Sequence, residues 1–500
     1  MLDDVMLIAR AAEIIRTERL NAAAALQRAF DEITSLFDQA EDPYLRERKG
    51  DVGDVVGRLS MNLRAGAPAD PFKDLEGPLV LVADELTPSM VAQLDWHRLA
   101  GLVTDAGSWT YHTAILARSI RIPAVAGIHH ASSLLAPGAL VAVDGGTGEV
   151  LVDPDADALA HLHDRQQRRE AYEHSLDEYR ALPAITEDGV EIRLEANIES
   201  PDDVAHAKAH GAVGIGLFRS EFLLAGGGQG SLTEEQQYEA YRRLVEETAP
   251  GRVTVRTFDV NEAQLSIGPG ALQGARAPLG LRGVRLSLAH DDIFQVQLRA
   301  LLRAAAHGSL RIMFPFVSGL EELRAARAAV ERAAASLGAR GIFVPTVPIG
   351  VMIEVPSAAI TADILADEAD FFSLGTNDLI QYALAVDRTD DRVSRLYEPL
   401  HPAILRLLRL VARAGRRRGL PVSVCGEMAS DPVLLTLLVG LGLTDFSMAP
   451  NAIPLAKQVL RGVRAADARQ VAGRALRAPT AADVERVLRQ LLAPLEIKRG

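Results

Sequence analysis

The chain has 500 residues, of which 48% are hydrophobic and 24% are charged. These values are typical of globular proteins and exclude a disordered or fibrous chain, and the length suits two or three domains. The formal charge is 53 − 66 = −13, which disfavours nucleic-acid binding, because that binding depends on basic side chains that replace phosphate counterions.

The single cysteine, Cys425, excludes an internal disulfide framework and a thiolate zinc cluster. A lone thiol is compatible with a reducing cytoplasm. The first four residues, 1–4, lack the basic and apolar regions of a signal peptide. No apolar run approaches the roughly 20 residues of a membrane helix. We therefore expect a cytoplasmic protein without membrane insertion.

The N-terminal third of the chain predicts three successive parts. Residues 1–65 are helical in period, with two or three helices interrupted at Pro43 and resuming at Tyr44. Residues 75–155 predict a small α/β domain with one helix after His112 and five short strands, at 78–83, 102–104, 124–126, 140–143 and 149–152. The highly charged stretch 156–182 predicts a solvated linker helix.

Residues 183–500 alternate short apolar strands with longer amphipathic segments. Eight strands are predicted, at 192–198, 213–218, 253–258, 310–316, 349–353, 370–374, 422–425 and 445–448. Eight strands separated by helical segments are typical of a (β/α)8 TIM barrel. An open doubly wound sheet is the main alternative, but no Gly-x-Gly-x-x-Gly follows the first strand.

Polar residues gather where the predicted strands end, which is where barrels of this kind place their catalytic groups. The set comprises Arg219, Glu221, Arg256, Asp259, Arg282, Glu354, Asn377, Asp378, Cys425 and Glu427. Arginine binds phosphate and carboxylate groups through two parallel hydrogen bonds. Carboxylates on neighbouring strands, such as Glu354 and Asp378, suit Mg²⁺. A ligand with a phosphate and a carboxylate would engage the whole set, although any one member could be a salt bridge or a cap, and Glu221 is expected to be structural.

His112 follows a glycine turn and is predicted to lie at the N-terminus of a helix. The free N–H groups and positive dipole there favour a phosphoryl group and disfavour the imidazolium form, which leaves a neutral nucleophile. Thr110 or a backbone carbonyl could fix its tautomer. A histidine beside a helix cap is, taken alone, more often structural.

Several ordered segments resemble one known family. They are residues 110–119, 214–222, 279–285, 311–315, 350–357, 371–379 and 425–428. From about residue 1 to 490 the chain resembles an N-terminally shortened Enzyme I of the bacterial phosphotransferase system, the phosphoenolpyruvate–protein phosphotransferase family.

The resemblance implies that phosphoenolpyruvate phosphorylates His112 with release of pyruvate, and that the phosphoryl group passes to a carrier of the HPr type. The implied substrate contacts are Arg219, Arg256, Arg282, Asn377 and Arg388; the implied Mg²⁺ ligands are Glu354 and Asp378; and Cys425 is the implied acid that protonates the enolate. Residues 1–65 would be a remnant of the HPr-binding subdomain, residues 75–155 a phosphohistidine swivel domain, and residues 183–500 a phosphoenolpyruvate-binding barrel that forms a homodimer.

The chain also departs from the family. Only 111 residues precede His112, and residues 260–264 lack the Gly-Gly-Asp-Lys found in many members. A regulatory paralogue that binds phosphoenolpyruvate without turnover therefore stays open. A dikinase or synthase would need an ATP-grasp domain, which 111 mostly helical residues cannot hold. A carbon–carbon lyase on a similar barrel would need neither the 75–155 domain nor His112. The final acceptor, and whether it serves sugar transport or nitrogen regulation, stays undefined.

Overall fold

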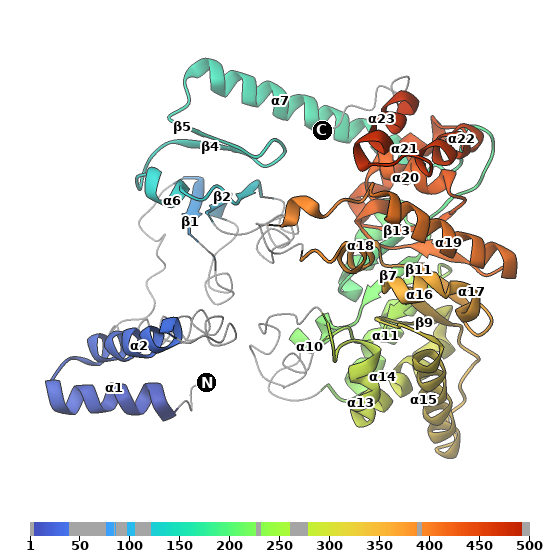
Figure 1. Ribbon diagram of the computed structural model, residues 1–500, viewed down its shortest axis with the longest axis horizontal. Helices are drawn as coiled ribbons and strands as arrows, with labels where there is room; N and C mark the ends of the chain where they lie inside the picture. The colour runs from blue at the N-terminus through green and yellow to red at the C-terminus, as the bar shows by residue number, and fades with distance from the viewer. Residues whose placement is uncertain are drawn as a thin grey trace. The chain divides into compact units, whose positions relative to one another are not determined.

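The computed structural model describes residues 5–39, 77–84, 86, 98–105, 122–226, 232–260, 279–387 and 393–492 (Figure 1). The chain divides into two compact units, residues 1–163 and 164–500.

The first unit begins with two helices that pack side by side, α1 (Val5–Glu18) and α2 (Ala22–Gln39) (Figure 1). Leu7 and Ile14 of α1 and Leu26 of α2 are buried, because apolar residues at this spacing share one helix face. The predicted helical character of this segment is confirmed for residues 5–39. Pro43 and the helix predicted from Tyr44 lie outside the described residues.

The rest of the first unit contains two small sheets. Strands β1 (Leu79–Ala83), β2 (Leu99–Thr104) and β3 (Ala124–Ala126) form a parallel sheet in that order, while β4 (Val141–Asp144) and β5 (Glu149–Val152) form an antiparallel pair. All five predicted strands are present. The helix predicted after His112, and His112 itself, lie outside the described residues.

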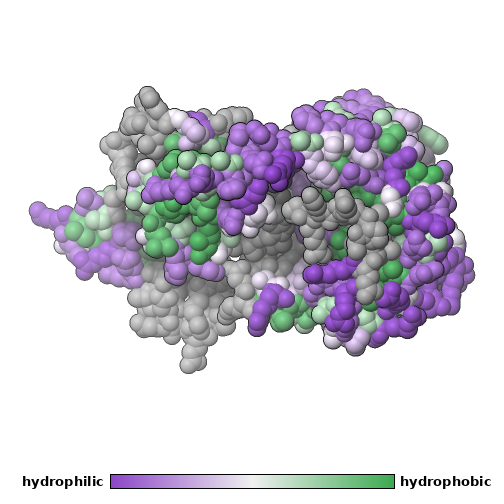
Figure 2. Space-filling view, turned by 90° about the horizontal axis from the view of Figure 1, so that it is seen from above, coloured by the Kyte–Doolittle hydropathy of each residue, from purple (hydrophilic) through white to green (hydrophobic). Residues whose placement is uncertain are grey.

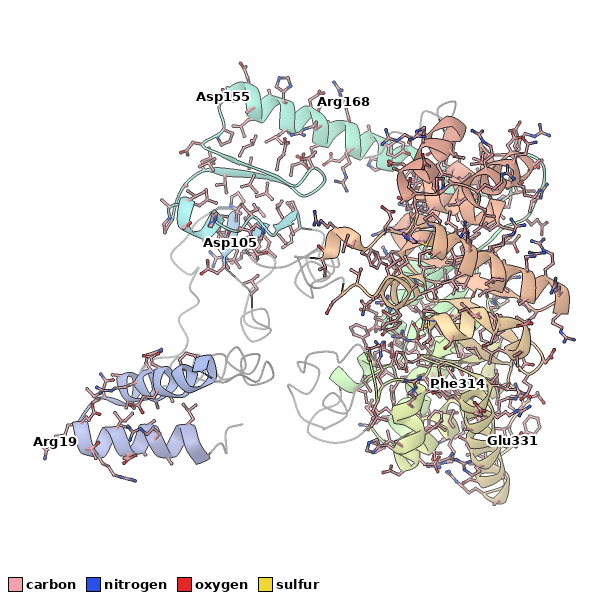
Figure 3. All side chains as sticks on the ribbon, in the orientation of Figure 1. Arg19, Asp105, Asp155, Arg168, Phe314 and Glu331 are labelled. Carbon is pink, nitrogen blue, oxygen red and sulfur yellow. The ribbon has the colours of Figure 1, made fainter. Side chains whose placement is uncertain are left out.

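Asp105, labelled in Figure 3, follows the end of β2. Its carboxylate accepts hydrogen bonds from the backbone N–H groups of Ala131 and Ser132 and thereby fixes the start of the short helix α6 (Ala131–Leu134).

The charged stretch after β5 forms helix α7 (Ala156–Ser175) and the single turn α8 (Asp177–Arg180), as predicted. Arg168, labelled in Figure 3, pairs with Asp164 one turn earlier at 2.7 Å, and both side chains are exposed. The end of this stretch is fixed within the second unit, because the buried Lys457 of α21 (Ile453–Arg461) donates to the carbonyl of Arg180 at 2.7 Å.

The second unit is a closed barrel of eight parallel strands, each paired with the next in chain order, with β13 paired to β6. The strands are β6 (Arg193–Ile198), β7 (Ile215–Arg219), β8 (Val253–Arg256), β9 (Leu310–Phe314), β10 (Ile349–Ile353), β11 (Phe371–Leu374), β12 (Val422–Val424) and β13 (Asp445–Met448). The predicted (β/α)8 architecture is therefore confirmed, and the open sheet is excluded.

Helices surround the barrel (Figure 1). They are α9 (Val204–Ala209), α10 (Phe222–Gly226), α11 (Glu234–Thr248), α13 (Val284–Ala289), α14 (Asp291–Ala304), α15 (Leu320–Ala339), α16 (Pro356–Ile360), α17 (Ala362–Leu365), α18 (Thr376–Leu384), α19 (Pro402–Arg418), α20 (Pro432–Gly440), α21, α22 (Ala465–Ala475) and α23 (Ala481–Leu492). In the described part of this unit, 3-10 turns supplement them at Pro201–Asp203, Ala305–His307, Ser394–Leu396, Glu427–Ala429 and Pro450–Ala452.

The core has two parts because successive side chains of a strand point to opposite faces. Phe314 of β9, labelled in Figure 3, packs edge-on against Phe294 of α14, with ring centroids 6.1 Å apart. A separate cluster joins residues of five strands or their ends: Leu217, Met313, Met352, Phe371 and Cys425. Hydrophilic residues cover most of the described surface in Figure 2. No helix in the described part of the chain is long and apolar enough to cross a membrane.

An ionic cluster lies at the N-terminal ends of three strands. Arg252, just before β8, contacts the buried Glu195 of β6 at 2.5 Å and Asp445 of β13 at 2.7 Å. These contacts tie β6, β8 and β13 together, which leaves the opposite end of the barrel as the place for ligand chemistry.

Candidate active site

The residues predicted at the strand ends lie at the C-terminal end of the barrel. Arg219 and Arg256 are the last residues of β7 and β8, and Glu354 follows β10. Asn377 and Asp378 lie in the first turn of α18, directly after β11, and Cys425 follows β12. Because all eight strands are parallel, these ends meet at one opening.

Two buried arginines share carboxylate partners at this opening. Arg256 pairs with Glu221, and its Nη1 lies 3.1 Å from Asp259. Arg282 contacts the same Asp259 at 2.8 Å and Asp378 at 3.2 Å. Asp259 therefore links Arg256 to Arg282, and Glu221 serves as the ion-pair partner of Arg256.

The carboxylates of this network raise the pKa of both buried arginines. Burial lowers the pKa of Arg256, but the neighbouring carboxylates, led by Glu221 and Asp259, raise that pKa by more. The same balance, led by Asp259 and Asp378, raises the pKa of Arg282. Both guanidinium groups are therefore permanently charged, as anion binding requires.

Glu354 is a buried carboxyl group close to two other carboxylates, Asp259 and Asp378. It is 2% exposed, and its Oε1 accepts the backbone N–H of Phe316 at 2.6 Å. Burial, together with the charges of Asp378 and Asp259, raises the pKa of Glu354 to about 8. Arg256 and Arg282 offset this only in part, and a cation beside Glu354 would favour its charged form.

The carboxylates fit a metal that takes few protein ligands. In the described ranges, no group of three or more His, Cys, Asp or Glu residues could hold a metal ion. Glu354 and Asp378 offer hard oxygen donors, and Mg²⁺ is commonly held by one or two carboxylates while water or substrate oxygens complete its octahedron. The donor set therefore suits Mg²⁺ and does not suit a cage made of protein ligands alone.

Arg219 differs from the other two arginines because it is partly exposed. Its Nη1 donates to Glu199 at 3.0 Å, and about a third of each side chain is accessible. Burial raises the pKa of Glu199, and the charge of Arg219 opposes that effect. Arg219 is thus held by a single contact, which leaves the rest of its guanidinium for a ligand.

Cys425 is buried, and its Sγ donates to the carbonyl of Leu374 at 3.6 Å. Burial raises the pKa of this thiol, so it stays protonated at neutral pH. Its backbone carbonyl accepts from Asn197 at 3.0 Å. Asn377 has its Oδ1 engaged by the backbone N–H of Glu427 at 2.9 Å, so its amide NH₂ remains the group that can reach a ligand.

One donor in this network has no partner. The Nε of Arg256 is buried and lacks a hydrogen-bond acceptor among the residues that the structure describes. The hydroxyl of Thr376, at the start of α18, is in the same state. Buried polar groups are normally satisfied, so these atoms point to a ligand that supplies oxygen atoms.

The structure does not describe every predicted site residue. His112, Arg388 and residues 261–264 of the altered loop lie outside the described residues. Conversely, Asn197, Glu199, Phe316 and Tyr382 contact the site and were not predicted. Asn197 is the last residue but one of β6 and Glu199 directly follows the strand, so the strand-end rule applied to the first strand would have found both. Tyr382 lies four residues after Asp378 and therefore shares its helix face.

The comparisons with known proteins agree with this geometry. Residues 173–465 match the PEP-binding domain of PEP-utilising enzymes, residues 75–148 match their mobile domain, and residues 1–48 match their N-terminal domain. The chain thus has the domains of a PEP-utilising enzyme.

Individual relatives define the family more closely. Phosphoenolpyruvate-protein phosphotransferases of Bacillus sp. (strain S) and Geobacillus stearothermophilus are each 40% identical over 494 residues, which cover 97% of this chain and 84% of theirs. That of Haemophilus influenzae is 38% identical over 496 residues, covering 98% and 85%. The chain belongs to the phosphoenolpyruvate-protein phosphotransferase family, which confirms the resemblance to Enzyme I and makes it a transferase. This family membership excludes the dikinase and lyase alternatives.

Proposed function

We propose that phosphoenolpyruvate phosphorylates His112 of this chain with release of pyruvate, and that the phosphoryl group then passes to a histidine carrier protein of the HPr type. The buried Arg256–Asp259–Arg282 network beside Glu354 and Asp378 carries this proposal. It combines fixed positive charge with hard oxygen donors, as a phosphate ester of a carboxylic acid requires.

The domain organisation follows from the same proposal. Residues 75–155 form the swivel domain that carries His112, residues 156–182 form its linker, and residues 183–500 form the barrel that binds phosphoenolpyruvate. Residues 1–65 form the carrier-binding part. The end of the linker is held on the barrel unit, where Tyr172 donates to Gln458 at 2.9 Å, so the swivel motion needs a pivot that precedes Tyr172.

Three arginines bind the substrate. Arg256 and Arg282 are buried and permanently charged, and Arg219 contributes a partly exposed guanidinium. The unpartnered Nε–H of Arg256 donates to a substrate oxygen, which satisfies an otherwise orphaned buried donor. Asn377 and Arg388 complete the contacts.

Glu354 and Asp378 hold Mg²⁺. When bound, the ion neutralises charge on the phosphoryl oxygens during transfer. The pKa of Glu354 supports this assignment, because burial and two nearby carboxylates raise that pKa and a divalent cation would oppose the effect.

The transfer itself relies on the positions of two side chains. The imidazole of His112 attacks the phosphorus, and the bond between phosphorus and the enolate oxygen breaks. The Cys425 thiol then gives its proton to carbon three, which yields pyruvate, and the thiolate regains a proton from solvent. Burial supports this role because it keeps Cys425 protonated.

We also propose, from the family, that the chain forms a homodimer through the barrel and acts in the cytoplasm.

Labelling tests the proposal. Wild-type protein is incubated with phosphoenolpyruvate carrying radioactive phosphorus and Mg²⁺, and incorporated label and released pyruvate are measured. We expect equal amounts of both, and no label in His112→Ala. The matched control is His161→Ala, which removes an exposed histidine of α7. Equal labelling of His112→Ala would refute the proposal, and binding of phosphoenolpyruvate without any labelling of wild type would favour the regulatory alternative.

A further inference from the structure

Phe316 has an unusual backbone conformation beside the site. It follows β9 and has φ = 60°, in the left-handed region that a residue with a side chain rarely adopts. A backbone strained in this way persists only where the surrounding structure imposes it, and strained residues are frequent at functional sites. In this conformation the N–H of Phe316 donates to Glu354 at 2.6 Å.

The Phe316 ring contacts two arginines at or just before the start of α13, which comes earlier in the chain. The guanidinium carbons of Arg282 and Arg285 each lie 4.9 Å from its centroid, within the range of a cation–π interaction. Gly283 lies between them in sequence, with φ = 57°, and a Cβ added there would come 2.7 Å from the Phe316 Cβ. Only glycine permits this close approach of the segment to Phe316.

Tyr382 contacts the same arginine through a different group. Its hydroxyl accepts from the Nη1 of Arg282 at 2.7 Å, and its ring packs edge-on against Phe316 with centroids 5.8 Å apart. Phe316 and Tyr382 therefore hold one guanidinium from two sides.

Arg282 also contacts two carboxylates through its other two nitrogens. Its Nε and Nη2 face the carboxylates of Asp259 and Asp378. Nη1 gives one of its two hydrogens to Tyr382. The Tyr382 hydroxyl thus adds a neutral acceptor on Nη1 to the two carboxylates that face Nε and Nη2.

We propose that Tyr382 and Phe316 are positioning residues that aim Arg282 at the substrate. This rests on the proposed function, and it adds two side chains that act on phosphoenolpyruvate affinity through Arg282. Their contacts add to those of Asp259 and Asp378, so that Arg282 is also held at Nη1 by the Tyr382 hydroxyl and against the Phe316 ring.

Tyr382→Phe tests the hydroxyl and keeps the ring. Loss of a hydrogen bond to a charged group should weaken phosphoenolpyruvate binding about tenfold. Affinity is measured by calorimetry on the full-length chain in the His112→Ala background, where no turnover occurs, and KM and kcat for pyruvate release are measured with His112 present. We expect KM to rise about tenfold while kcat changes by less than about twofold, because uniform binding is lost.

The matched control is Tyr238→Phe. The Tyr238 hydroxyl lies 2.9 Å from Nε2 of His307, and Arg303 lies 3.9 Å over its ring, so this variant also removes a tyrosine hydroxyl contact, here on α11, and keeps a ring beside an arginine. A purely structural role for Tyr382 would give both variants the same behaviour. We expect Tyr238→Phe to leave affinity and KM unchanged.

Phe316→Leu tests the ring and keeps a side chain at the strained position. Loss of the cation–π contact should weaken phosphoenolpyruvate binding about threefold. Phe343→Leu is its control, since Phe343 is 80% exposed. An unchanged affinity in Phe316→Leu would remove Phe316 from the proposal.

A double substitution tests whether Tyr382 acts through Arg282. Lysine cannot form the guanidinium fork, so in an Arg282→Lys background Tyr382→Phe should cause no further loss of affinity. The inference is overturned if Tyr382→Phe binds phosphoenolpyruvate like wild type, or if its full effect persists beside Arg282→Lys. A wild-type chain that binds phosphoenolpyruvate without labelling His112 refutes the proposed function alone, whereas one that binds none refutes both.

Discussion

Glu354→Gln should stabilise the metal-free protein at alkaline pH and abolish its stabilisation by Mg²⁺. Burial and the charges of Asp378 and Asp259 raise the pKa of Glu354 to about 8. A glutamine retains an oxygen that can accept the N–H of Phe316, but it removes the charge that burial and the two carboxylates oppose.

The size of the effect follows from proton linkage. The folded pKa of about 8 lies above the ordinary value of 4.5, so the folded protein holds the proton across a range in which the unfolded chain has lost it. The stability from this proton is complete below pH 4.5 and is lost as pH rises to about 8. At about 1.36 kcal/mol for each unit, the loss reaches up to about 5 kcal/mol.

Urea unfolding at about pH 6 and about pH 9, with and without Mg²⁺, measures the part of this loss that lies between about pH 6 and about pH 8, which is about 2.7 kcal/mol. The variant should exceed wild type most at the higher pH without metal, and Mg²⁺ should stabilise wild type alone. Glu331→Gln is the control, because Glu331 is an exposed residue of α15 (Figure 3). A variant less stable than wild type at the higher pH without metal, or one stabilised equally by Mg²⁺, would refute the reasoning.

Three further substitutions test separate parts of the account. Cys425→Ala should lower the rate of pyruvate release by about 10²- to 10⁴-fold, as loss of a general acid does, and an unchanged rate in a coupled pyruvate assay would remove that role. Arg256→Lys, which loses the unpartnered Nε–H, should raise KM for phosphoenolpyruvate at least about tenfold, whereas an unaltered KM would show that this group does not meet the substrate. Gly350→Ala should lower the free energy of unfolding by about 1–3 kcal/mol, because the added Cβ would lie 2.4 Å from the Phe371 ring. Gly338→Ala, whose Cβ would meet nothing within 4 Å, should cost nothing in the same urea titration, and equal losses would contradict the packing argument.

The barrel was predictable because its strands carry a strong local signal. A strand that is buried on both faces is a short continuous apolar run, and Ile349–Ile353 shows this pattern over the same residues in the sequence and in the structure. The count of eight such runs then indicated closure, and the ends of β7, β8 and β10 located Arg219, Arg256 and Glu354.

The pairing of the side chains was not predictable, because it depends on contacts between residues distant in sequence. Arg256 and its partner Glu221 are 35 residues apart, and Arg282 and Tyr382 are 100 apart. The positive φ of Phe316 has no local signal either, since phenylalanine is not a residue that favours the left-handed region.

The central claim is that phosphoenolpyruvate delivers its phosphoryl group to residue 112. Tandem mass spectrometry of the wild-type chain, digested at alkaline pH after brief exposure to phosphoenolpyruvate and Mg²⁺, tests it most directly. The account predicts one phosphorylated peptide, with the modification on His112. An unmodified His112 peptide together with continued pyruvate release, or a phosphoryl group on another residue, would contradict it.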